Sequence, residues 1–215
     1  MNKLVIASNK LVIASSNQGK LRELQAMLTP LGIEVFTQAQ LGISEAEEPH
    51  PTFVENALAK ARHASAASGL PALADDSGIC VAALNGVPGV LSARYASGLH
   101  AEQKNNDQRN NEKLLRDMQG VTDRRAHYYC VLALVRSAND PQPIITEGEW
   151  HGEIAMQARG EGGFGYDPIF WLPELGKMSA ELTRDEKAQI SHRALALKIL
   201  LQRLQALSNN KMRES

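Results

Sequence analysis

Two adjacent carboxylates, Asp75 and Asp76, follow the short apolar run 72–74. Neighbouring side chains on an extended chain point to opposite faces, so one carboxylate can face a site while the other supports it from behind. Two anions this close repel one another unless a cation lies between them or one stays protonated. Carboxylate oxygens are also the ligands that Mg²⁺ prefers, together with substrate phosphates. The pair therefore predicts a metal and water-activating centre, and a solvated Asp-Asp-Ser-Gly turn is the alternative.

A second acidic pair, Glu47 and Glu48, precedes a proline-bounded loop. These side chains could reach Asp75 or Asp76 and add oxygen ligands to the same metal. A solvated acidic run is the alternative, and spacing alone leaves both interpretations open.

The polar stretch 15–20 lies between an expected strand and an expected helix. A helix N-terminus presents N–H groups and a partial positive charge, so it suits a phosphate. The glycine spacing of a Walker A loop is absent, and simple helix capping by Ser16 or Asn17 is the alternative. The candidate phosphate contacts are Ser15, Ser16, Asn17, Gln18, Gly19 and Lys20.

The glycine-rich stretch 162–168 contains two aromatic residues, Phe164 and Tyr166. Glycine lets the backbone approach a ligand closely, and an exposed aromatic face can stack on a nucleobase. The stretch therefore suggests a base-binding loop, and a tight turn whose rings enter the core is the alternative.

Three basic residues, Lys187, His192 and Arg193, lie on the expected closing helix. On an ideal helix Lys187 and His192 point about 140° apart. Both can touch one ligand only if the helix breaks near Ser191 or the ligand lies along its end. Surface charge on a long helix is the alternative.

The elements that must position these residues alternate between strands and helices early in the chain and include a hairpin late. The expected fold is therefore α/β, with a mixed, strongly bent β-sheet flanked by helices and two lobes around a central cleft. We expect strands at 33–37, 72–75, 79–84, 125–136 and 144–150, and helices at 21–31, 52–69, 109–118 and from 183 to beyond 204.

The heptapeptide at 2–8 is repeated exactly at 9–15. Only the second copy runs directly into the polar stretch 15–20, so we expect it to form the first strand. The expected organisation is an N-terminal extension over residues 1–8, a single domain over residues 9–208 and a C-terminal tail over residues 209–215.

The composition is that of an ordinary globular protein, with 215 residues, of which 43% are hydrophobic and 22% charged. The net charge of −1 argues against a general nucleic-acid binder. Cys80 and Cys130 lie in apolar runs without disulfide or zinc spacing, so we expect reduced core thiols. No membrane-spanning run or signal peptide is evident, and the expected location is the cytoplasm.

Taken together, the motifs resemble the Ham1-like pyrophosphatases of non-canonical purine nucleoside triphosphates. The resemblance covers the chain from the second heptapeptide onward. It rests on six blocks in order, at 15–20, 52–57, 74–78, 92–95, 162–168 and 191–193.

The resemblance implies a hydrolase that converts dITP, ITP and XTP to the monophosphate and pyrophosphate, depends on Mg²⁺, and forms a homodimer. Glu47 and Asp76 would bind the metal, with Glu48 and Asp75 as further candidates, and Asp76 would accept a proton from the metal-activated water that attacks the α-phosphorus. Residues 15–20 and Lys60 would contact the phosphates. Ser77 and the base-side group would hold the nucleotide, and that group comprises Phe164, Gly165, Tyr166, Asp167, Lys187, His192 and Arg193.

Base choice follows from hydrogen bonding. Arg193 carries donors only, so it suits the 6-oxo group of hypoxanthine and xanthine and would leave buried donors unpaired against the amine of adenine. How guanine is excluded does not follow from the sequence. Two other functions remain open, a Maf-like nucleotide pyrophosphatase with a different base preference and a nucleotide sensor without turnover.

Overall fold

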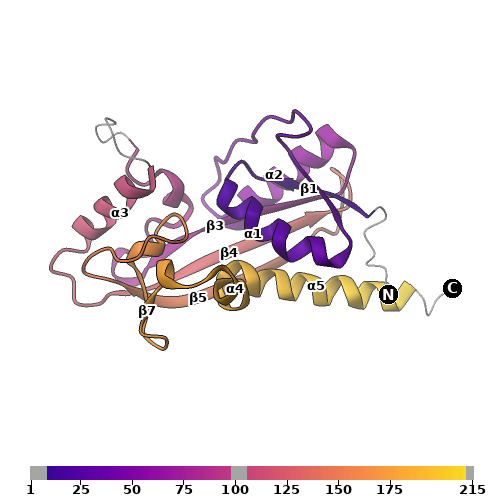
Figure 1. The fold of residues 1–215 in the computed structure, drawn as a ribbon. Helices are drawn as coiled ribbons and strands as arrows, with labels where there is room; N and C mark the ends of the chain where they lie inside the picture. Colours follow the sequence, from indigo (N-terminus) through magenta and orange to yellow (C-terminus); the bar gives the residue numbers. More distant parts are fainter. Residues whose placement is uncertain (1–8, 98–105, 212–215) are drawn as a thin grey trace. The chain divides into compact units, whose positions relative to one another are not determined.

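The computed structural model describes residues 9–97 and 106–211 of the chain, with side chains up to residue 207 (Figure 1). The strands are β1 (Lys10–Ala14), β2 (Glu34–Thr37), β3 (Ala72–Val81), β4 (Arg125–Val135), β5 (Ile144–Ile154), β6 (Phe170–Leu172) and β7 (Lys177–Met178). The α-helices are α1 (Gln18–Leu28), α2 (Phe53–Ser68), α3 (Asn106–Asp117), α4 (Arg184–Ile190) and α5 (His192–Lys211).

The seven strands form one sheet in the order β2-β1-β3-β4-β5-β6-β7. β1 pairs in parallel with both β2 and β3, whereas the β5–β6 and β6–β7 pairs are antiparallel. The predicted mixed α/β class is therefore confirmed. The bend and the cleft stay predictions.

β1 consists of the second heptapeptide copy, as predicted. Its residues 11–14 are all buried, and Lys10 pairs with Glu34 of β2. This arrangement carries the chain directly from Ala14 through a three-residue connection into α1. The first copy lies outside the described residues.

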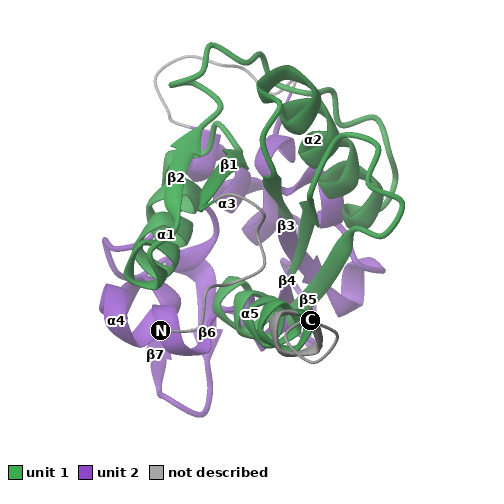
Figure 2. Ribbon diagram, turned by 90° about the vertical axis from the view of Figure 1, so that its right-hand side faces the viewer, with its two compact units in different colours: residues 1–76, 130–148, 193–215 green, residues 77–129, 149–192 purple. Residues whose placement is uncertain are grey.

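The chain divides into two compact units, shown in green and purple in Figure 2. Unit 1 comprises residues 1–76, 130–148 and 193–215, and unit 2 comprises residues 77–129 and 149–192. The strands β3, β4 and β5 each contribute residues to both units.

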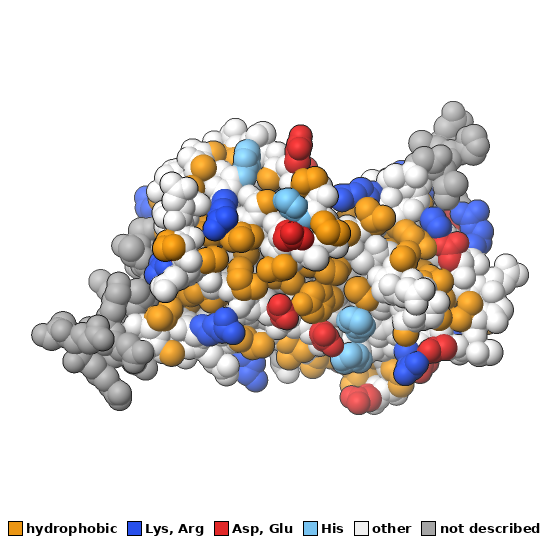
Figure 3. Space-filling view, turned by 180° about the vertical axis from the view of Figure 1, so that it is seen from behind, with side chains coloured by type: hydrophobic (Ala, Val, Ile, Leu, Met, Phe, Trp, Pro, Cys, Tyr) orange, Lys and Arg blue, Asp and Glu red, His pale blue; other side chains and the backbone are white. Residues whose placement is uncertain are grey.

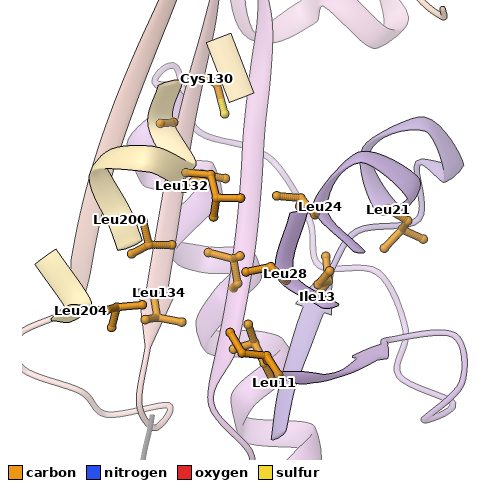
Figure 4. Packing of buried hydrophobic residues seen from close by; sticks show 14 residues of the cluster. Leu11, Ile13, Leu21, Leu24, Leu28, Cys130, Leu132, Leu134, Leu200 and Leu204 are labelled. Atoms are coloured by element: carbon orange, nitrogen blue, oxygen red, sulfur yellow. The ribbon is translucent and has the colours of Figure 1, made fainter. Parts of the chain in front are cut away.

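The core of unit 1 joins α1 and α5 to the sheet (Figure 4). Alternate residues of β1, Leu11 and Ile13, face this core, as the two-residue period of a strand requires. Leucines at helical spacing on α1 and on α5 pack against the same face, and α2 contacts β1 as well. The other core members include Leu21, Leu24, Leu28, Leu73, Cys130, Leu132, Leu134, Leu200 and Leu204.

The core of unit 2 is rich in aromatic rings. Tyr128 on β4 packs edge to face against Phe170 at 4.7 Å between ring centroids, and Trp150 on β5 lies 5.4 Å from the same ring. Leu114 of α3 and Met118, which directly follows this helix, belong to this cluster. Tyr166, a residue of the predicted base-binding loop, is part of the same cluster.

The expected break between strands at 72–75 and 79–84 is wrong, because β3 runs without interruption from Ala72 to Val81 and residues 82–84 form a short 3-10 helix. Glycine is needed at position 78 because the segment that contains Gly89 and Ser92 packs closely against it. A Cβ at this position would lie 2.3 Å from the Gly89 carbonyl oxygen and 2.4 Å from Ser92 Oγ. That hydroxyl accepts a hydrogen bond from the Ile79 N–H at 2.9 Å.

The expected single closing helix is also wrong, because it breaks at Ser191 into α4 and α5. Thr183 caps α4 with the predicted capping box, and Ser191 adopts an extended backbone with ψ 157°. Its N–H still bonds to the Lys187 carbonyl, which closes the last turn of α4. This break meets the condition stated above, that Lys187 and His192 can contact one ligand only if the helix is interrupted near Ser191.

On the face shown in Figure 3, basic and acidic side chains both occur, with hydrophobic and uncharged surface between them. This mixture is in line with the net charge of −1. In the part of the chain that the structure describes, no helix is both long enough and apolar enough to span a membrane.

Deleting residues 2–8 should leave the fold intact, because the strand that pairs with β2 and β3 is built from residues 10–14. We expect thermal melting to change by less than about 3 °C, which corresponds to under about 1 kcal/mol for a domain of this size. Circular dichroism on the full chain and the deletion variant measures this. Loss of cooperative melting in the variant would show that the first copy is needed.

Candidate active site

Asp75 is a buried carboxylate on β3 that is surrounded by positive charge. Lys20 Nζ lies 2.6 Å from its Oδ1, and Arg193 Nε donates to its Oδ2 at 2.8 Å. Burial alone would raise the pKa of Asp75, but the charges of Arg193 and Lys20 outweigh it and hold the pKa well below its ordinary value. Asp75 therefore favours its ionised form and pairs with two cations.

Asp76, the next residue, faces a different set of partners. Lys60 Nζ on α2 donates to Asp76 Oδ1 and to Glu48 Oε1, at 2.8 Å in each case. Among the described residues, Asp76 Oδ2 is buried and has no hydrogen-bond partner. Burial raises the pKa of Asp76 more than Lys60 and Lys20 lower it, and nearby Glu48 adds to the rise. This carboxylate therefore has one unused oxygen and a greater tendency to take up a proton than an exposed aspartate.

Lys60 bridges two carboxylates and stays protonated. Burial would lower its pKa, but the charges of Asp76 and Glu48 raise it above the ordinary value. The bridge holds Glu48, one of the predicted metal ligands, next to Asp76. Glu47 is exposed, and no cluster of three or more potential metal-ligating residues occurs within residues 9–97 and 106–211.

The polar stretch 15–20 connects β1 to α1, as expected. Asn17 is the N-cap residue, and its Oδ1 accepts from the Gly19 and Lys20 N–H groups at 2.9 and 3.1 Å. Ser15 Oγ accepts from the Asn17 N–H at 3.2 Å. Ser16, Asn17 and Gln18 are exposed and Gly19 is buried, so the capping interpretation is realised and polar side chains remain accessible beside it.

Arg193, at the start of α5, is fully buried, with a side chain only 1% exposed. It binds Asp75 of β3 and, through Nη1, Glu23 of α1. These carboxylates raise its pKa against the opposing effect of burial. The structure therefore directs this guanidinium to two carboxylates, and a contact with a base oxygen would require some of these bonds to be exchanged.

Asp167 accepts hydrogen bonds from several residues in and around the predicted base-binding loop of unit 2. Its carboxylate accepts from Lys187 Nζ at 2.6 Å, from Ser179 Oγ at 2.8 Å and from the Phe164 N–H at 2.9 Å. The Tyr128 hydroxyl donates to it at 3.4 Å. The side chain is only 2% exposed, so Asp167 organises its neighbours and holds the Lys187 ammonium.

The two rings of the glycine-rich loop go to different places. Tyr166 is buried, and its hydroxyl donates to the Ser92 carbonyl at 2.8 Å. Its predicted role as an exposed stacking surface is therefore wrong, because the ring fills the core of unit 2. Phe164 is half-buried, and Lys187 Nζ lies 4.8 Å from its ring centroid.

His192 stacks on the ring of Tyr128. Its imidazole lies parallel to Tyr128 at 4.7 Å between centroids, with an interplanar angle of 6°, and 6.4 Å from Trp150. Ser77, half-buried on β3, belongs to the same unit. The imidazole orientation is therefore determined by the sheet residues on which it stacks.

Within each unit, direct contacts link several of the predicted residues. In unit 1, Lys20, Asp75 and Arg193 are linked by direct contacts, and Lys60 links Glu48 to Asp76. The unit 2 group is centred on Asp167 and contains Phe164 and Lys187.

Several residues in direct contact with these groups escaped the sequence analysis. Tyr128 could have been found, because it shares the inward parity of β4 with Cys130, whose thiol donates to Asp75 at 3.1 Å. Glu23 and Ser179 carry no comparable signal, since a single polar residue on a helix or in a loop is ordinary.

Comparison with known proteins adds an independent line of evidence. The model of the Ham1 family matches residues 11–203 of this chain. The chain belongs to the Ham1 family. A relative from Nitrosomonas europaea, named dITP/XTP pyrophosphatase, is 62% identical over 196 residues, covering 91% of this chain and 94% of the relative. A protein of the same name from Ralstonia nicotianae is 60% identical, covering 93% and 98% of the two chains.

Solved structures of Ham1 proteins share the fold. A HAM1 protein from Coxiella burnetii superimposes with a TM-score of 0.79 at 44% identity, over 95% of this chain and 98% of the other. The Staphylococcus aureus Ham1 protein gives a TM-score of 0.77 at 40% identity, over 94% and 99%. The Ham1 fold therefore extends over nearly the whole chain.

Replacing Arg193 with methionine should destabilise the protein by roughly 3 kcal/mol, because it leaves the buried Asp75 carboxylate without its main partner. Arg203→Met on the same helix is the matched control, since Arg203 is exposed and its guanidinium donates to a backbone carbonyl, that of Ile145. Urea unfolding at pH 7 measures both free energies. Equal losses in the two variants would contradict the structural role given to Arg193.

Proposed function

We propose that this Ham1 protein hydrolyses dITP, ITP and XTP to the corresponding monophosphate and pyrophosphate, and so removes non-canonical purines from the nucleotide pool. The names of the Nitrosomonas and Ralstonia relatives support this substrate class. The structural observation that carries the proposal is Asp76, a buried carboxylate with one unused oxygen beside a lysine-bridged glutamate.

The residues present fit a magnesium ion. A buried carboxylate oxygen without a protein partner is a donor of the kind that Mg²⁺ prefers. Mg²⁺ usually takes one or two carboxylates and completes its shell with water and substrate phosphates, so a cluster of three protein ligands is not required. We assign Asp76 as a ligand, with Glu47, Glu48 and Asp75 as the other candidates. When bound, the ion would polarise the phosphate and help to activate water.

The residues proposed to contact the phosphates lie in unit 1. Lys60 and Lys20 would balance the negative charge that develops on the triphosphate, and such fixed charges act most strongly in a site from which water is excluded. Ser15, Ser16, Asn17, Gln18 and Gly19 would supply further polar contacts at the start of α1. Asp75 keeps the Lys20 ammonium in place at 2.6 Å.

Asp76 would accept the proton of the water that attacks the α-phosphorus, and pyrophosphate would leave. Its pKa is already raised by burial, and a carboxylate with a higher pKa is a better proton acceptor near neutral pH. Ser77, its neighbour on β3, would contact the substrate.

The residues proposed to contact the base lie in unit 2, apart from Arg193, which lies in unit 1. Phe164 would offer a ring face to the purine, with Gly165, Tyr166 and Asp167 shaping the loop that carries it. Lys187 has only donors, so it suits the 6-oxo group of hypoxanthine or xanthine and would leave an unpaired donor against the amine of adenine. His192 would contact the base edge, and Arg193 stays a candidate if its bonds to carboxylates are exchanged on binding.

We further propose that the protein acts as a homodimer in the cytoplasm and does not depend on nucleic acid. The near-neutral net charge of −1 supports the last point, since nucleic-acid binders are usually basic. Sedimentation equilibrium tests the dimer directly.

Pyrophosphate release from ITP, XTP, dITP, GTP and ATP, with magnesium and with excess EDTA, tests the proposed function. We expect turnover of dITP, ITP and XTP that is lost in EDTA, and kcat/KM for ATP lower by at least about 100-fold, because a site built for a 6-oxo group leaves donors unpaired against the amine of adenine. A preference for pyrimidine triphosphates would indicate a Maf-like activity. Binding without any turnover would indicate a sensor.

Changing Asp76 to Asn should lower kcat by at least about 100-fold, because the amide can neither accept the proton nor bind the metal as an anion. We expect the melting temperature to change little, since ionising the buried Asp76 carboxylate is unfavourable in the folded protein. Steady-state kinetics with dITP and thermal melting measure both quantities. Near-normal kcat in this variant would remove Asp76 from the mechanism.

A further inference from the structure

Gly165, in the middle of the aromatic loop 162–167, has both of its backbone polar groups bonded to side chains of α3. Its N–H donates to Asp107 Oδ2 at 2.7 Å, and its carbonyl accepts from Asn111 Nδ2 at 3.0 Å. Residues four apart lie on one face of a helix. A single face of α3 therefore holds one residue of the loop from both sides.

The held residue lies at a turning point of the loop. Gly165 has φ +63°, in the left-handed region that favours glycine. Phe164 precedes it, and the Phe164 N–H bonds to Asp167 Oδ2. The backbone on each side of Phe164 is therefore attached to a carboxylate, and these attachments determine where the ring lies beside Lys187.

Asn111 is a costly residue for the fold alone. Asn111 is buried, with only 8% of the residue exposed. Among the described residues, its Oδ1 has no hydrogen-bond partner. Burying an unsatisfied amide oxygen lowers stability, and an apolar residue of similar shape would avoid this cost. The bond to the Gly165 carbonyl is the contact that accounts for an amide here.

We propose that Asp107 and Asn111 are positioning residues for the purine side of the site. They fix the Gly165 backbone, and through it they hold Phe164 against Lys187 in the geometry that receives the base. They act through the loop and do not touch the substrate. This inference rests on the proposed function, because the ligand of the loop is the purine of that substrate.

The variant Asn111→Leu tests the inference by separating stability from binding. Leucine removes the bond to Gly165 and also removes the unsatisfied oxygen. We expect the Kd for inosine monophosphate to rise about tenfold, the effect of one well-placed hydrogen bond, while the Kd for pyrophosphate and the melting temperature stay the same or the latter rises. Calorimetric titration of each ligand and thermal melting measure these quantities.

Asp107 provides a second and independent variant pair. Asp107→Ala should also weaken inosine monophosphate binding about tenfold, because it removes the acceptor of the Gly165 N–H. Asp107→Asn should restore most of it, since an amide oxygen still accepts that bond. Glu174→Ala, which removes an exposed carboxylate from the turn between β6 and β7 of the same unit, is the matched control and should leave binding unchanged.

The outcomes are distinct. Unchanged inosine monophosphate binding in both Asn111→Leu and Asp107→Ala would overturn the inference, and so would an equal weakening of inosine monophosphate and pyrophosphate. If the unmodified protein released pyrophosphate from dITP while these variants matched Glu174→Ala, only the positioning role would fail. If the unmodified protein released none, the proposed function would fail and the inference with it.

Discussion

The organising constraint in unit 1 is the burial of two adjacent carboxylates on one strand. A buried anion is tolerated only when cations or hydrogen bonds offset its lost hydration. Asp75 has Lys20 of α1 and Arg193 of α5, and Asp76 has Lys60 of α2. Because each cation comes from a different helix, charge balance links three helices to the same short stretch of β3.

The partners of these carboxylates also explain why two chemically identical neighbours have different roles. Asp75 is enclosed by cations, and its pKa lies well below the ordinary value, so it stays ionised and structural. Asp76 shares a single ammonium with Glu48 and retains a buried oxygen without a partner among the described residues. The alternation of side chains along a strand places the two carboxylates in separate environments.

In unit 2, a glycine-rich loop depends in a similar way on hydrogen bonds with side chains around it. A glycine-rich segment has little intrinsic order, since glycine loses more conformational entropy on folding than other residues. Side chains from outside the loop supply the order, through Asp107 and Asn111 on α3 and through Ser179 and Lys187 around Asp167. The loop can therefore be rich in glycine and still hold Phe164 in one place.

The sequence by itself determined the mixed α/β class, the use of the second heptapeptide as β1 and the caps of α2 and α4, because hydrophobic period and capping are local signals. Only the tertiary structure decided that β3 continues through Gly78, that the closing helix breaks at Ser191 and that Arg193 faces Glu23 and Asp75. Each of these depends on partners far away in the chain. Residue types and spacing do not encode such long-range packing.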